Sequence, residues 1–318
     1  ALSPMMRAGE ALARLRQVGV PRDFMANCYV VDGQFHLLGL VTVRDLIMAP
    51  TGQRLDQFMV QPAARLHPED DQERAVEAMD RLDQVELPVV DEKDRLVGTV
   101  TADDAMDVMQ AEATEDMERM AAMAPSERPY LRTRVWDLYR SRIFWLLLLM
   151  LSATFTGMVT THYEEAFVSL PLLVSFMPML MDTAGNCGNQ ISTLMVRGLA
   201  LGEVEPSDFL KVLGKELRVS AIVGAVLGLV NGLRIYLMYT YLYAGQYDNV
   251  IGYAVVVSVS LFFSVILAKL VGGMLPLAAK KLGADPAIMA TPFITTIVDA
   301  CSLILYFQIA QAVFRGMM

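Results

Sequence analysis

The sequence predicts an α-helical polytopic membrane protein, with five transmembrane helices per protomer, joined by a long connecting helix to a soluble α/β domain. The chain has 318 residues and is 54% hydrophobic, yet its formal net charge is -9. Residues 1–128 carry 13 Lys or Arg against 24 Asp or Glu, whereas residues 129–318 carry 13 against 11. The charge therefore divides the chain into an acidic soluble part and an apolar membrane part.

The soluble part contains a tandem repeat. Residues 31–45 recur as residues 90–104, 59 positions further on. Each copy predicts a strand that ends in Asp, a polar turn, a second strand and a helix that starts at a Thr-x-x-Asp step. Amphipathic helices are expected to precede the copies at residues 9–18 and 71–82. The second copy is preceded by Phe58-Met59-Val60-Gln61-Pro62 and the first has no equivalent, so we expect the first repeat to be truncated at its start.

A run of acids follows the second repeat, and residues 103–118 hold seven acidic side chains without one basic side chain (Asp103, Asp104, Asp107, Glu112, Glu115, Asp116 and Glu118). On a continuous helix, like charges three or four residues apart repel each other by a few tenths of a kcal/mol per pair. Divalent cations would reverse that effect. The simpler alternative is a solvated acidic face, but the run leads directly towards the membrane part, which favours divalent sensing.

Breaker residues end this acidic helix, and residues 125–129 form a short linker. The sign of the charge then changes, because four arginines lead into the first apolar block (Arg132, Arg134, Arg140 and Arg142). Such a cluster is typical of a cytoplasmic juxtamembrane segment. We therefore expect a regulatory domain over residues 1–111, a connecting helix and linker over 112–130, and a transmembrane domain over 131–318.

Five apolar blocks are each long enough to cross about 30 Å of hydrocarbon; they cover residues 143–161, 167–199, 219–242, 250–271 and 286–314. The loops after the second and fourth blocks contain Lys or Arg, whereas those after the first and third contain acids and no Lys or Arg. The positive-inside rule then predicts a cytoplasmic soluble part and an extracytoplasmic C-terminus. The expected location is the inner (plasma) membrane. No signal peptide is evident.

The last block contains an intramembrane carboxylate, Asp299. A charge near the bilayer midplane costs about 2.5 to 3.5 kcal/mol, so such residues are functional by default. On a helix, Thr291, Thr295, Asp299, Ser302 and Tyr306 share one stripe, which predicts the wall of an ion path. The alternative is structural pairing of Asp299 with Arg234 or Lys269.

The second block carries Gly185 and Gly188 among side chains that are unusually polar for a lipid-facing helix (Asp182, Asn186, Asn189, Gln190 and Thr193). Either Asn189 or Gln190 falls at helical spacing with Asn186 and Thr193. The functional interpretation is a second wall of the path, and the alternative is a small-residue helix contact strengthened by amide hydrogen bonds.

Amide, hydroxyl and carboxylate oxygens suit a hard cation such as Mg²⁺ or Ca²⁺. The three cysteines are too few and too scattered for a zinc site or a disulfide framework. Five helices are few to enclose a hydrated ion, so we expect a two-fold homodimer with the path on its axis. The expected partners are a second copy and the lipid bilayer, and no nucleic acid.

The repeated Gly-x-Val-Thr-x-x-Asp pattern resembles a tandem pair of CBS domains over residues 1–111. In that family the Thr and Asp often hold the ribose of an adenine nucleotide. The resemblance thus implies that ATP is a possible ligand of Thr42, Asp45 and Thr101, with Asp104 beside Thr101.

The CBS pair, the Glu112–Asp116 segment, the Gly-Asn-x-Gly-Asn-Gln of residues 185–190, the Asp285-Pro286-Ala287 step and Asp299 together resemble an MgtE-type magnesium channel or transporter. The resemblance covers essentially the whole chain. It implies a homodimer that passes Mg²⁺ along its axis and is closed by cytosolic Mg²⁺ through the CBS domains and a connecting "plug" helix.

The resemblance assigns residues by their place in these motifs. Asp299 matches a pore carboxylate, with Asn189 and Thr193 beside it, and Thr295, Asn186 and Asp182 are the further pore candidates. The regulatory Mg²⁺ ligands would be Asp71, Asp104, Asp107, Glu112, Glu115 and Asp116. Two departures stand out: the chain lacks the acidic helical domain that many family members carry before the CBS pair, and Met181-Asp182 replaces small neutral residues, which leaves ion selectivity open.

The sequence leaves two other function classes open. A proton- or sodium-coupled divalent cation transporter would cycle a proton on Asp182 or Asp299. An intramembrane aspartyl protease would use the same two acids as a dyad, but Asp299 lacks the Gly-x-Gly-Asp setting of such enzymes. We therefore predict a Mg²⁺ channel or transporter gated by cytosolic Mg²⁺, and no enzymatic activity.

Overall fold

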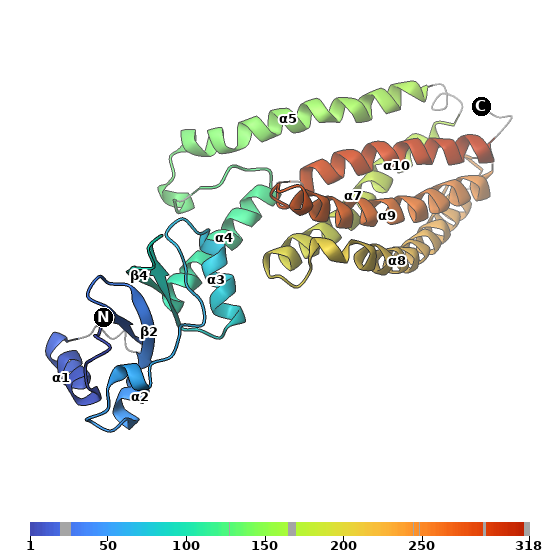
Figure 1. Cartoon of the computed structure of the whole chain (residues 1–318). Coiled ribbons are helices and arrows are strands. Elements are labelled where there is room, and N and C mark those ends of the chain that lie inside the picture. The colour runs from blue at the N-terminus through green and yellow to red at the C-terminus, as the bar shows by residue number, and fades with distance from the viewer. Residues whose placement is uncertain are drawn as a thin grey trace. The chain divides into compact units, whose positions relative to one another are not determined.

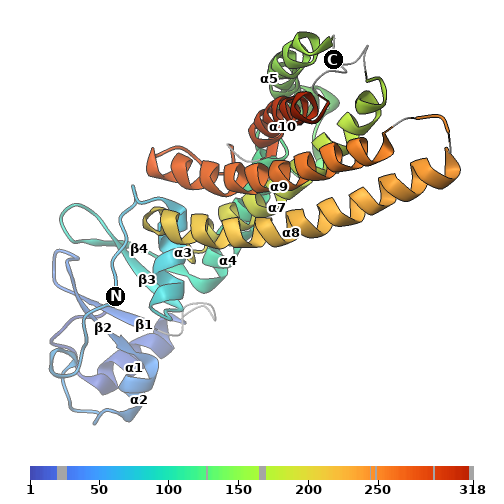
Figure 2. The same cartoon turned by 90° about the vertical axis from the view of Figure 1, so that its right-hand side faces the viewer.

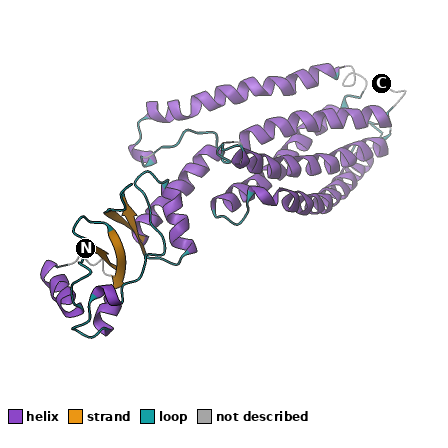
Figure 3. Cartoon of the chain, viewed as in Figure 1, coloured by secondary structure: helices purple, strands orange, loops and turns teal. Residues whose placement is uncertain are grey.

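The structure is a computed structural model that describes residues 1–19, 27–126, 128–164, 170–243, 245–247, 249–288 and 291–314. It forms two compact units, Ala1–Thr114 and Glu115–Met318. Strands occur only in the first of them among the described residues, and the second is helical (Figures 1 and 3).

The N-terminal unit consists of two equivalent helix-hairpin-helix repeats, which confirms the repeat predicted at an offset of 59 residues. Its elements in order are α1 (Ala8–Val18), β1 (Asn27–Val31), β2 (Leu37–Thr42), α2 (Val43–Met48), η2 (Leu55–Gln57), α3 (Gln72–Arg81), β3 (Glu86–Val90), β4 (Leu96–Thr101) and α4 (Ala102–Met120). In each repeat two antiparallel strands form a separate sheet, β1 with β2 and β3 with β4.

The two hairpins pair with each other at their turns. The Leu37 amide donates to the Asp94 carbonyl and the Leu96 amide donates to the Phe35 carbonyl, both at 2.9 Å. Phe35 and Asp94 hold the same place in their turns and both have left-handed backbones, with φ of 68° and 58°. The crossed pair of hydrogen bonds therefore relates the repeats by an approximate two-fold axis.

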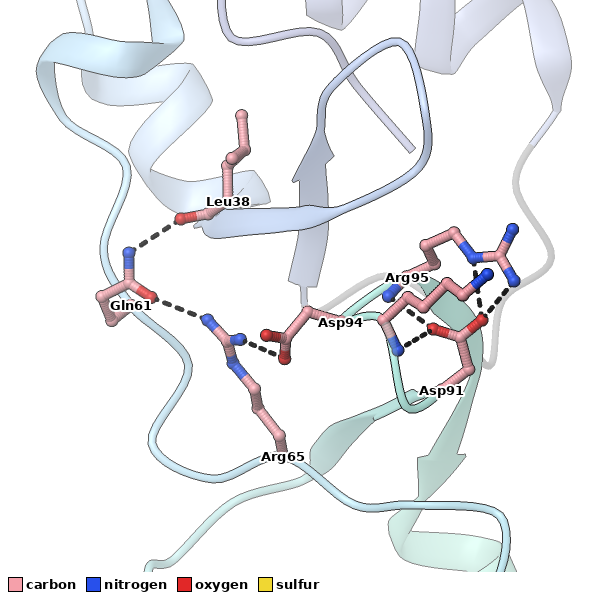
Figure 4. Close-up of polar contacts among 7 residues, drawn as sticks. Leu38, Gln61, Arg65, Asp91, Asp94 and Arg95 are labelled. Atoms are coloured by element: carbon pink, nitrogen blue, oxygen red, sulfur yellow. Dashed lines mark hydrogen bonds and ion pairs between the residues drawn. The ribbon is translucent and has the colours of Figure 1, made fainter.

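Side chains from the segment between the repeats tie the hairpins together (Figure 4). Arg65 Nη1 donates to Asp94 Oδ1 at 2.9 Å, and Gln61 Nε2 donates to the Leu38 carbonyl at 2.8 Å. In the same turn, hydrogen bonds from the Arg95 side chain and backbone lower the pKa of Asp91 to about 2. That carboxylate therefore stays ionised at neutral pH and holds the turn.

Each repeat has its own apolar core, and a third cluster joins them. Leu46 and Leu55 are fully buried in the first repeat, and Leu87 is buried in the second. Tyr29 and Val90, one from each repeat, lie in the cluster between the sheets. Two small sheets thus become one folding unit, as expected for repeats that cannot bury their sheets alone.

The C-terminal unit is a bundle of long helices: α5 (Val135–His162), α7 (Leu172–Ala200), α8 (Phe209–Leu237, continued by a π-helical turn, Met238–Leu242), α9 (Val250–Lys281) and α10 (Thr291–Val313). Helix α9 packs along α7, α8 and α10, and α10 also packs on α7 (Figure 2). Helix α5 packs mainly on α10. The five helices match the five predicted spans in position.

Four of these helices are both long and apolar enough to cross a membrane: α5, the segment that contains α8, α9 and α10. Helix α7 has 29 residues, which suffices in length. Because α7 carries polar side chains, its mean hydropathy is lower than that of the other four helices. Several of these polar side chains form the candidate site.

Helix α4 is continuous from Ala102 to Met120. The last helix of the second repeat and the predicted connecting helix are therefore one helix. Its first thirteen residues belong to the N-terminal unit and its last turns, from Glu115, belong to the C-terminal unit.

Candidate functional site

One face of α7 is polar and is left uncovered by the rest of the chain. Asp182, Asn186, Gln190, Thr193 and Arg197 are all exposed, and they follow each other at steps of four, four, three and four residues. This spacing places them on one stripe of the helix. We call these five residues the α7 stripe.

The exposed face of a neighbouring helix has the opposite character. On α8 the exposed side chains include Ile222, Val226, Leu229 and Leu233, as expected of a lipid-facing helix. A polar stripe in a membrane helix needs water, ions or another protein surface against it. The α7 stripe is therefore the candidate functional face of the bundle.

The buried face of α7 packs closely on α9 and α10 because it carries glycines. A Cβ atom at Gly188 would lie 2.8 Å from Ile294 Cγ2 and 3.2 Å from the Ala268 carbonyl oxygen, so no larger residue fits there without a shift. A Cβ at Gly185 would lie 3.6 Å from Thr295 Cγ2. The predicted small-residue helix contact is thus present, on the face opposite the stripe.

These contacts also align the carboxylates of two helices. The helices are antiparallel, because Tyr306 late in α10 donates to the Leu173 carbonyl at the start of α7, whereas Gly188 further along α7 contacts Ile294 near the start of α10. One further turn brings Asp182 and Asp299 to the same level. Asp299 is partly buried.

The predicted five-residue stripe on α10 is wrong in its second half. Ser302 and Tyr306 are fully buried, and the Tyr306 hydroxyl donates to the Leu173 carbonyl at 2.9 Å. They face the core because α10 packs on both α7 and α9. Thr295 and Asp299 are partly accessible, and the side chain of Thr291 lies outside the described residues.

Among the described residues, no ion pair joins Asp299 to either basic residue suggested as its partner. The Arg234 guanidinium donates to Asn231 Oδ1, at 2.8 and 3.1 Å, and contacts Met179 Sδ. Lys269 is buried on α9, with 7% of its surface exposed. Structural pairing therefore does not explain Asp299.

Asn189 lies at the edge of the α7 stripe. Its side chain is partly buried, and its amide oxygen is inaccessible and has no hydrogen-bond partner in the described part of the chain. Gln190 is exposed on the stripe itself. Of the two amides that the sequence left as alternatives, Gln190 holds the exposed position.

The acids predicted to hold regulatory Mg²⁺ have diverse surroundings. Asp71 caps α3 by accepting from the Glu73 amide at 3.1 Å, and Glu112 accepts from Gln72. Asp107 is exposed, and Asp116 and Glu115 are partly buried. Among the described residues of one chain, no three acidic, His or Cys side chains converge to hold a metal ion.

The end of α4 reaches the membrane helices. Arg119 forms ion pairs with Glu115, one turn earlier, and with Asp285, just before α10. Met120 packs on Val196 of α7 and on Ala287. Sequence reasoning missed this contact because it read residues 103–118 as an acidic run, and Arg119 is the next residue.

The residues proposed for nucleotide binding form helix caps. Thr42 Oγ1 donates to Asp45 Oδ2 at 2.6 Å while the Asp45 amide donates back to Thr42 Oγ1 at 3.0 Å. Thr101 and Asp104 repeat this arrangement at the start of α4, with the hydroxyl at 2.7 Å from the carboxylate. Hydrogen bonds from the Thr101 side chain and backbone lower the pKa of Asp104. The Thr-x-x-Asp steps therefore have a structural role in both repeats.

Comparisons with known proteins agree with this architecture. The family described as "MgtE: Divalent cation transporter" matches residues 177–309, from α7 to α10. The CBS domain matches residues 55–111.

Among curated proteins, the magnesium transporter MgtE of Thermus thermophilus is 33% identical over 311 residues, which is 98% of this chain and 67% of the relative. MgtE of Bacillus subtilis is 30% identical over 308 residues, 97% of this chain and 66% of the relative. The chain thus spans about two thirds of the length of these relatives.

A solved structure of the cytosolic domain of the Mg²⁺ channel MgtE in complex with ATP is 36% identical over 34% of this chain and 43% of that chain, with a TM-score of 0.33. The alignments with the two curated relatives cover 98% and 97% of this chain, so they include both the N-terminal unit and the membrane helices. By this similarity, the chain belongs to the MgtE family of divalent cation transporters.

Proposed function

We propose that this chain conducts Mg²⁺ across a membrane and that Mg²⁺ on the side of the CBS unit closes the path. The observation that carries the proposal is the α7 stripe, a polar face on a helix of a membrane bundle that the chain itself leaves uncovered. The family relationship supports Mg²⁺ as the transported ion, because the relatives are named magnesium transporters.

A second copy would complete the path. Two α7 stripes that face each other across a two-fold axis would enclose polar side chains between protomers. Each protomer would add Asp299 and Thr295 from α10. Two carboxylates at one level match the charge of a divalent ion.

The side chains of this path suit an ion that keeps its water. Mg²⁺ sheds water reluctantly and usually binds through one or two carboxylates and several waters. In the proposed path Asp299 provides the charge, while Asn186, Thr193 and Thr295 provide hydrogen-bonding groups for the hydration shell. Asp182 adds a carboxylate at the level of Asp299.

Closure is proposed to act through the acids of the N-terminal unit and α4. Because the described residues of one chain bring no three acids together, a regulatory site would combine one or two carboxylates of this chain with water or with carboxylates of a second copy. Asp107→Ala combined with Glu115→Ala is expected to weaken closure by millimolar Mg²⁺. Unchanged closure in this double variant would reject the sensor.

ATP is proposed only as a ligand of the CBS unit, near the caps at Thr42 and Thr101. We also propose that the CBS unit is cytoplasmic and that the C-terminus lies on the opposite side. Basic residues in the first turns of α8 and at the end of α9 support this orientation (Lys211, Lys215, Arg218, Lys280 and Lys281).

A proton- or sodium-coupled transporter is the second candidate. The level shared by Asp182 on α7 and Asp299 on α10 favours it, because a coupled transporter needs an intramembrane acid that can carry a proton. Mg²⁺ flux that follows an imposed proton or sodium gradient would support this candidate over the channel.

The decisive experiment is divalent uptake into liposomes that contain the purified chain. Flux of Mg²⁺ and Ca²⁺ is compared for the wild type, Asp299→Ala and a control, Glu203→Gln, which alters an exposed loop acid. We expect Mg²⁺ flux in the wild type and the control, and lost or unselective flux in Asp299→Ala. Equal, selective flux in all three proteins would reject the proposed path.

A further inference from the structure

The segment that leads into α5 is rich in exposed arginine. Five arginines lie within residues 128–142, and all are exposed (Arg128, Arg132, Arg134, Arg140 and Arg142). The stretch contains one acid, Asp137. We call residues 128–142 the juxtamembrane segment.

These arginines have no carboxylate partner within ion-pair distance in the part of the chain that the structure describes. Five other arginines are paired there (Arg54, Arg65, Arg74, Arg95 and Arg119). The contrast matters because the chain has 35 acidic residues. A net positive segment in an acidic protein thus presents its charges outward.

Aromatic side chains alternate with the arginines. Tyr130 is 67% exposed, Trp136 is 59% exposed and Tyr139 is 47% exposed. The Trp136 and Tyr139 rings stack at 4.9 Å, and the Arg140 guanidinium lies 5.4 Å from the centre of the Trp136 ring. Exposed Trp and Tyr beside an apolar span are typical of the depth of lipid headgroups.

The length of α5 places this segment at the same depth. The apolar run Ile143–Thr161 covers about 28 Å at 1.5 Å per residue, which fills the hydrocarbon layer. Helix α5 begins at Val135, eight residues before that run. Its first two turns therefore extend about 12 Å beyond the hydrocarbon, into the layer that contains lipid phosphates.

We propose that the juxtamembrane segment binds the headgroups of anionic phospholipids in the leaflet where α5 begins. Arginine binds phosphate oxygens through two parallel N–H groups, and clusters of four or more basic residues next to a membrane helix recognise anionic lipids. An acidic protein partner would satisfy the arginines alone. A lipid surface satisfies both the arginines and the exposed rings, and it is continuous with the apolar run.

The bound lipid would be coupled to the end of α4. The Ala124 amide donates to the Ser141 carbonyl at 2.9 Å, so the linker after α4 is joined to the first turns of α5. The Ser126 amide donates to Glu118 Oε2 at 2.7 Å. Headgroup binding would therefore hold the linker that follows Arg119 and Met120. This inference concerns lipid binding, and it does not depend on which ion the chain conducts.

Tryptophan fluorescence tests the proposal directly, because the chain has only two tryptophans, Trp136 and Trp145. Trp145→Phe leaves Trp136 as the single reporter. The full chain is reconstituted in phosphatidylcholine vesicles with a fixed fraction of phosphatidylglycerol, and one of the two lipids is brominated near its headgroup. Stronger quenching by brominated phosphatidylglycerol than by brominated phosphatidylcholine measures enrichment of the anionic lipid at Trp136.

Two charge-removing variants share the Trp145→Phe background: Arg132→Gln with Arg134→Gln, and Arg140→Gln with Arg142→Gln. The matched control is Lys280→Gln with Lys281→Gln, which removes two basic residues at the end of α9. Each arginine is expected to contribute up to about fivefold to the preference for anionic lipid. Each arginine double variant should therefore show a severalfold lower preference for anionic lipid at low salt, whereas the lysine double variant should retain the preference of the Trp145→Phe background.

Equal quenching by the two brominated lipids, or a preference that survives both arginine pairs, would overturn the proposal. Soluble glycerol phosphate at millimolar concentration provides a further arm. If it abolishes the preference, the site binds free phosphate and the membrane-docking proposal fails. If the preference survives, lipid is the ligand. Elution of each variant as a single species in detergent, with wild-type helical content, establishes that the variants fold.

Discussion

Arg119 in the last turn of α4 forms an ion pair with Asp285, which precedes α10, and a second ion pair with Glu115. A positive charge of the protein itself thus lies between two of its carboxylates. These ion pairs hold the last turn of α4 against the membrane helices. A divalent cation that binds Glu115 or Asp285 must therefore compete with the Arg119 guanidinium for the carboxylate.

Replacement of Arg119 by Gln should make the position of this turn dependent on divalent cations. Without the guanidinium, Glu115 and Asp285 repel each other and the turn loosens. We expect faster amide hydrogen exchange over residues 115–122 in EDTA, and recovery of protection when Mg²⁺ is added. Arg74→Gln, which removes a surface ion pair with Asp70, is the control. Protection in EDTA equal to that of the wild type would contradict the prediction.

Gly188→Ala should weaken the packing of α7 on α9 and α10. The added methyl group would lie 2.8 Å from Ile294 Cγ2 and 3.2 Å from the Ala268 carbonyl, and overpacking of this kind typically costs about 1 to 3 kcal/mol. Gly157→Ala is the matched control, because nothing lies within 4 Å of its Cβ position on α5. Thermal unfolding in detergent should show a lower midpoint for Gly188→Ala alone.

The buried carboxyl group of Glu86 should make the stability of the N-terminal unit depend on pH. Burial raises the pKa of Glu86, and hydrogen bonds from the Thr99 side chain and the Asn27 backbone only partly oppose this. A carboxyl group with a raised pKa in the folded state stabilises most below its unfolded value of 4.5, and that contribution is lost as the pH rises through the folded pKa.

At neutral pH the N-terminal unit of Glu86→Gln should therefore be more stable, and better protected against hydrogen exchange, than that of the wild type. The difference in protection should shrink below pH 4.5. Hydrogen exchange of strands β3 and β4, corrected for the intrinsic pH dependence of exchange, measures it. Glu77→Gln on the solvent side of α3 is the control. A stabilisation that is the same at both pH values would show that charge burial is not its cause.

Asp182→Asn and Asp299→Asn should differ in their effects on flux. Asp182 is exposed and Asp299 is partly buried, so the charge of Asp299 acts in a less solvated position, where electrostatic interactions are stronger. We expect Asp299→Asn to abolish selective Mg²⁺ uptake, while Asp182→Asn retains uptake with an altered ratio of Mg²⁺ to Ca²⁺. The same liposome assay measures both, and equal losses would contradict the ranking.

Thr101→Ala should destabilise α4 through the loss of its cap. Loss of an N-cap side chain costs about 1 kcal/mol. The Asp104 amide donates to Thr101 Oγ1 at 3.4 Å, and the Thr101 hydroxyl donates to the Asp104 carboxylate at 2.7 Å. The decrease in stability is expected without any nucleotide present. If ATP also stabilises the wild type, loss of that increment in Thr101→Ala would support the nucleotide proposal, whereas an equal increment in both proteins would argue against it.

The sequence alone indicated a soluble and a membrane part, the 59-residue repeat and the helical spans, whereas the boundary between the two compact units falls inside α4. These features depend on local periodicity and on charge counted over many residues, which neighbouring elements do not alter. The bounds of α1 and α3 fall within one residue of those predicted. The polar residues of α7 were also evident, because Asp, Asn and Gln are rare in lipid-facing helices.

Only the tertiary structure decided which of the polar side chains are accessible. Ser302 and Tyr306 share a helical stripe with Asp299, yet packing of α10 on two helices buries them. Gln190 rather than Asn189 is exposed because the glycine contacts fix the rotation of α7. The ion pair of Arg119 with Asp285 joins residues 166 positions apart. Helical periodicity specifies which residues share a face, whereas contacts between distant segments decide which face is buried.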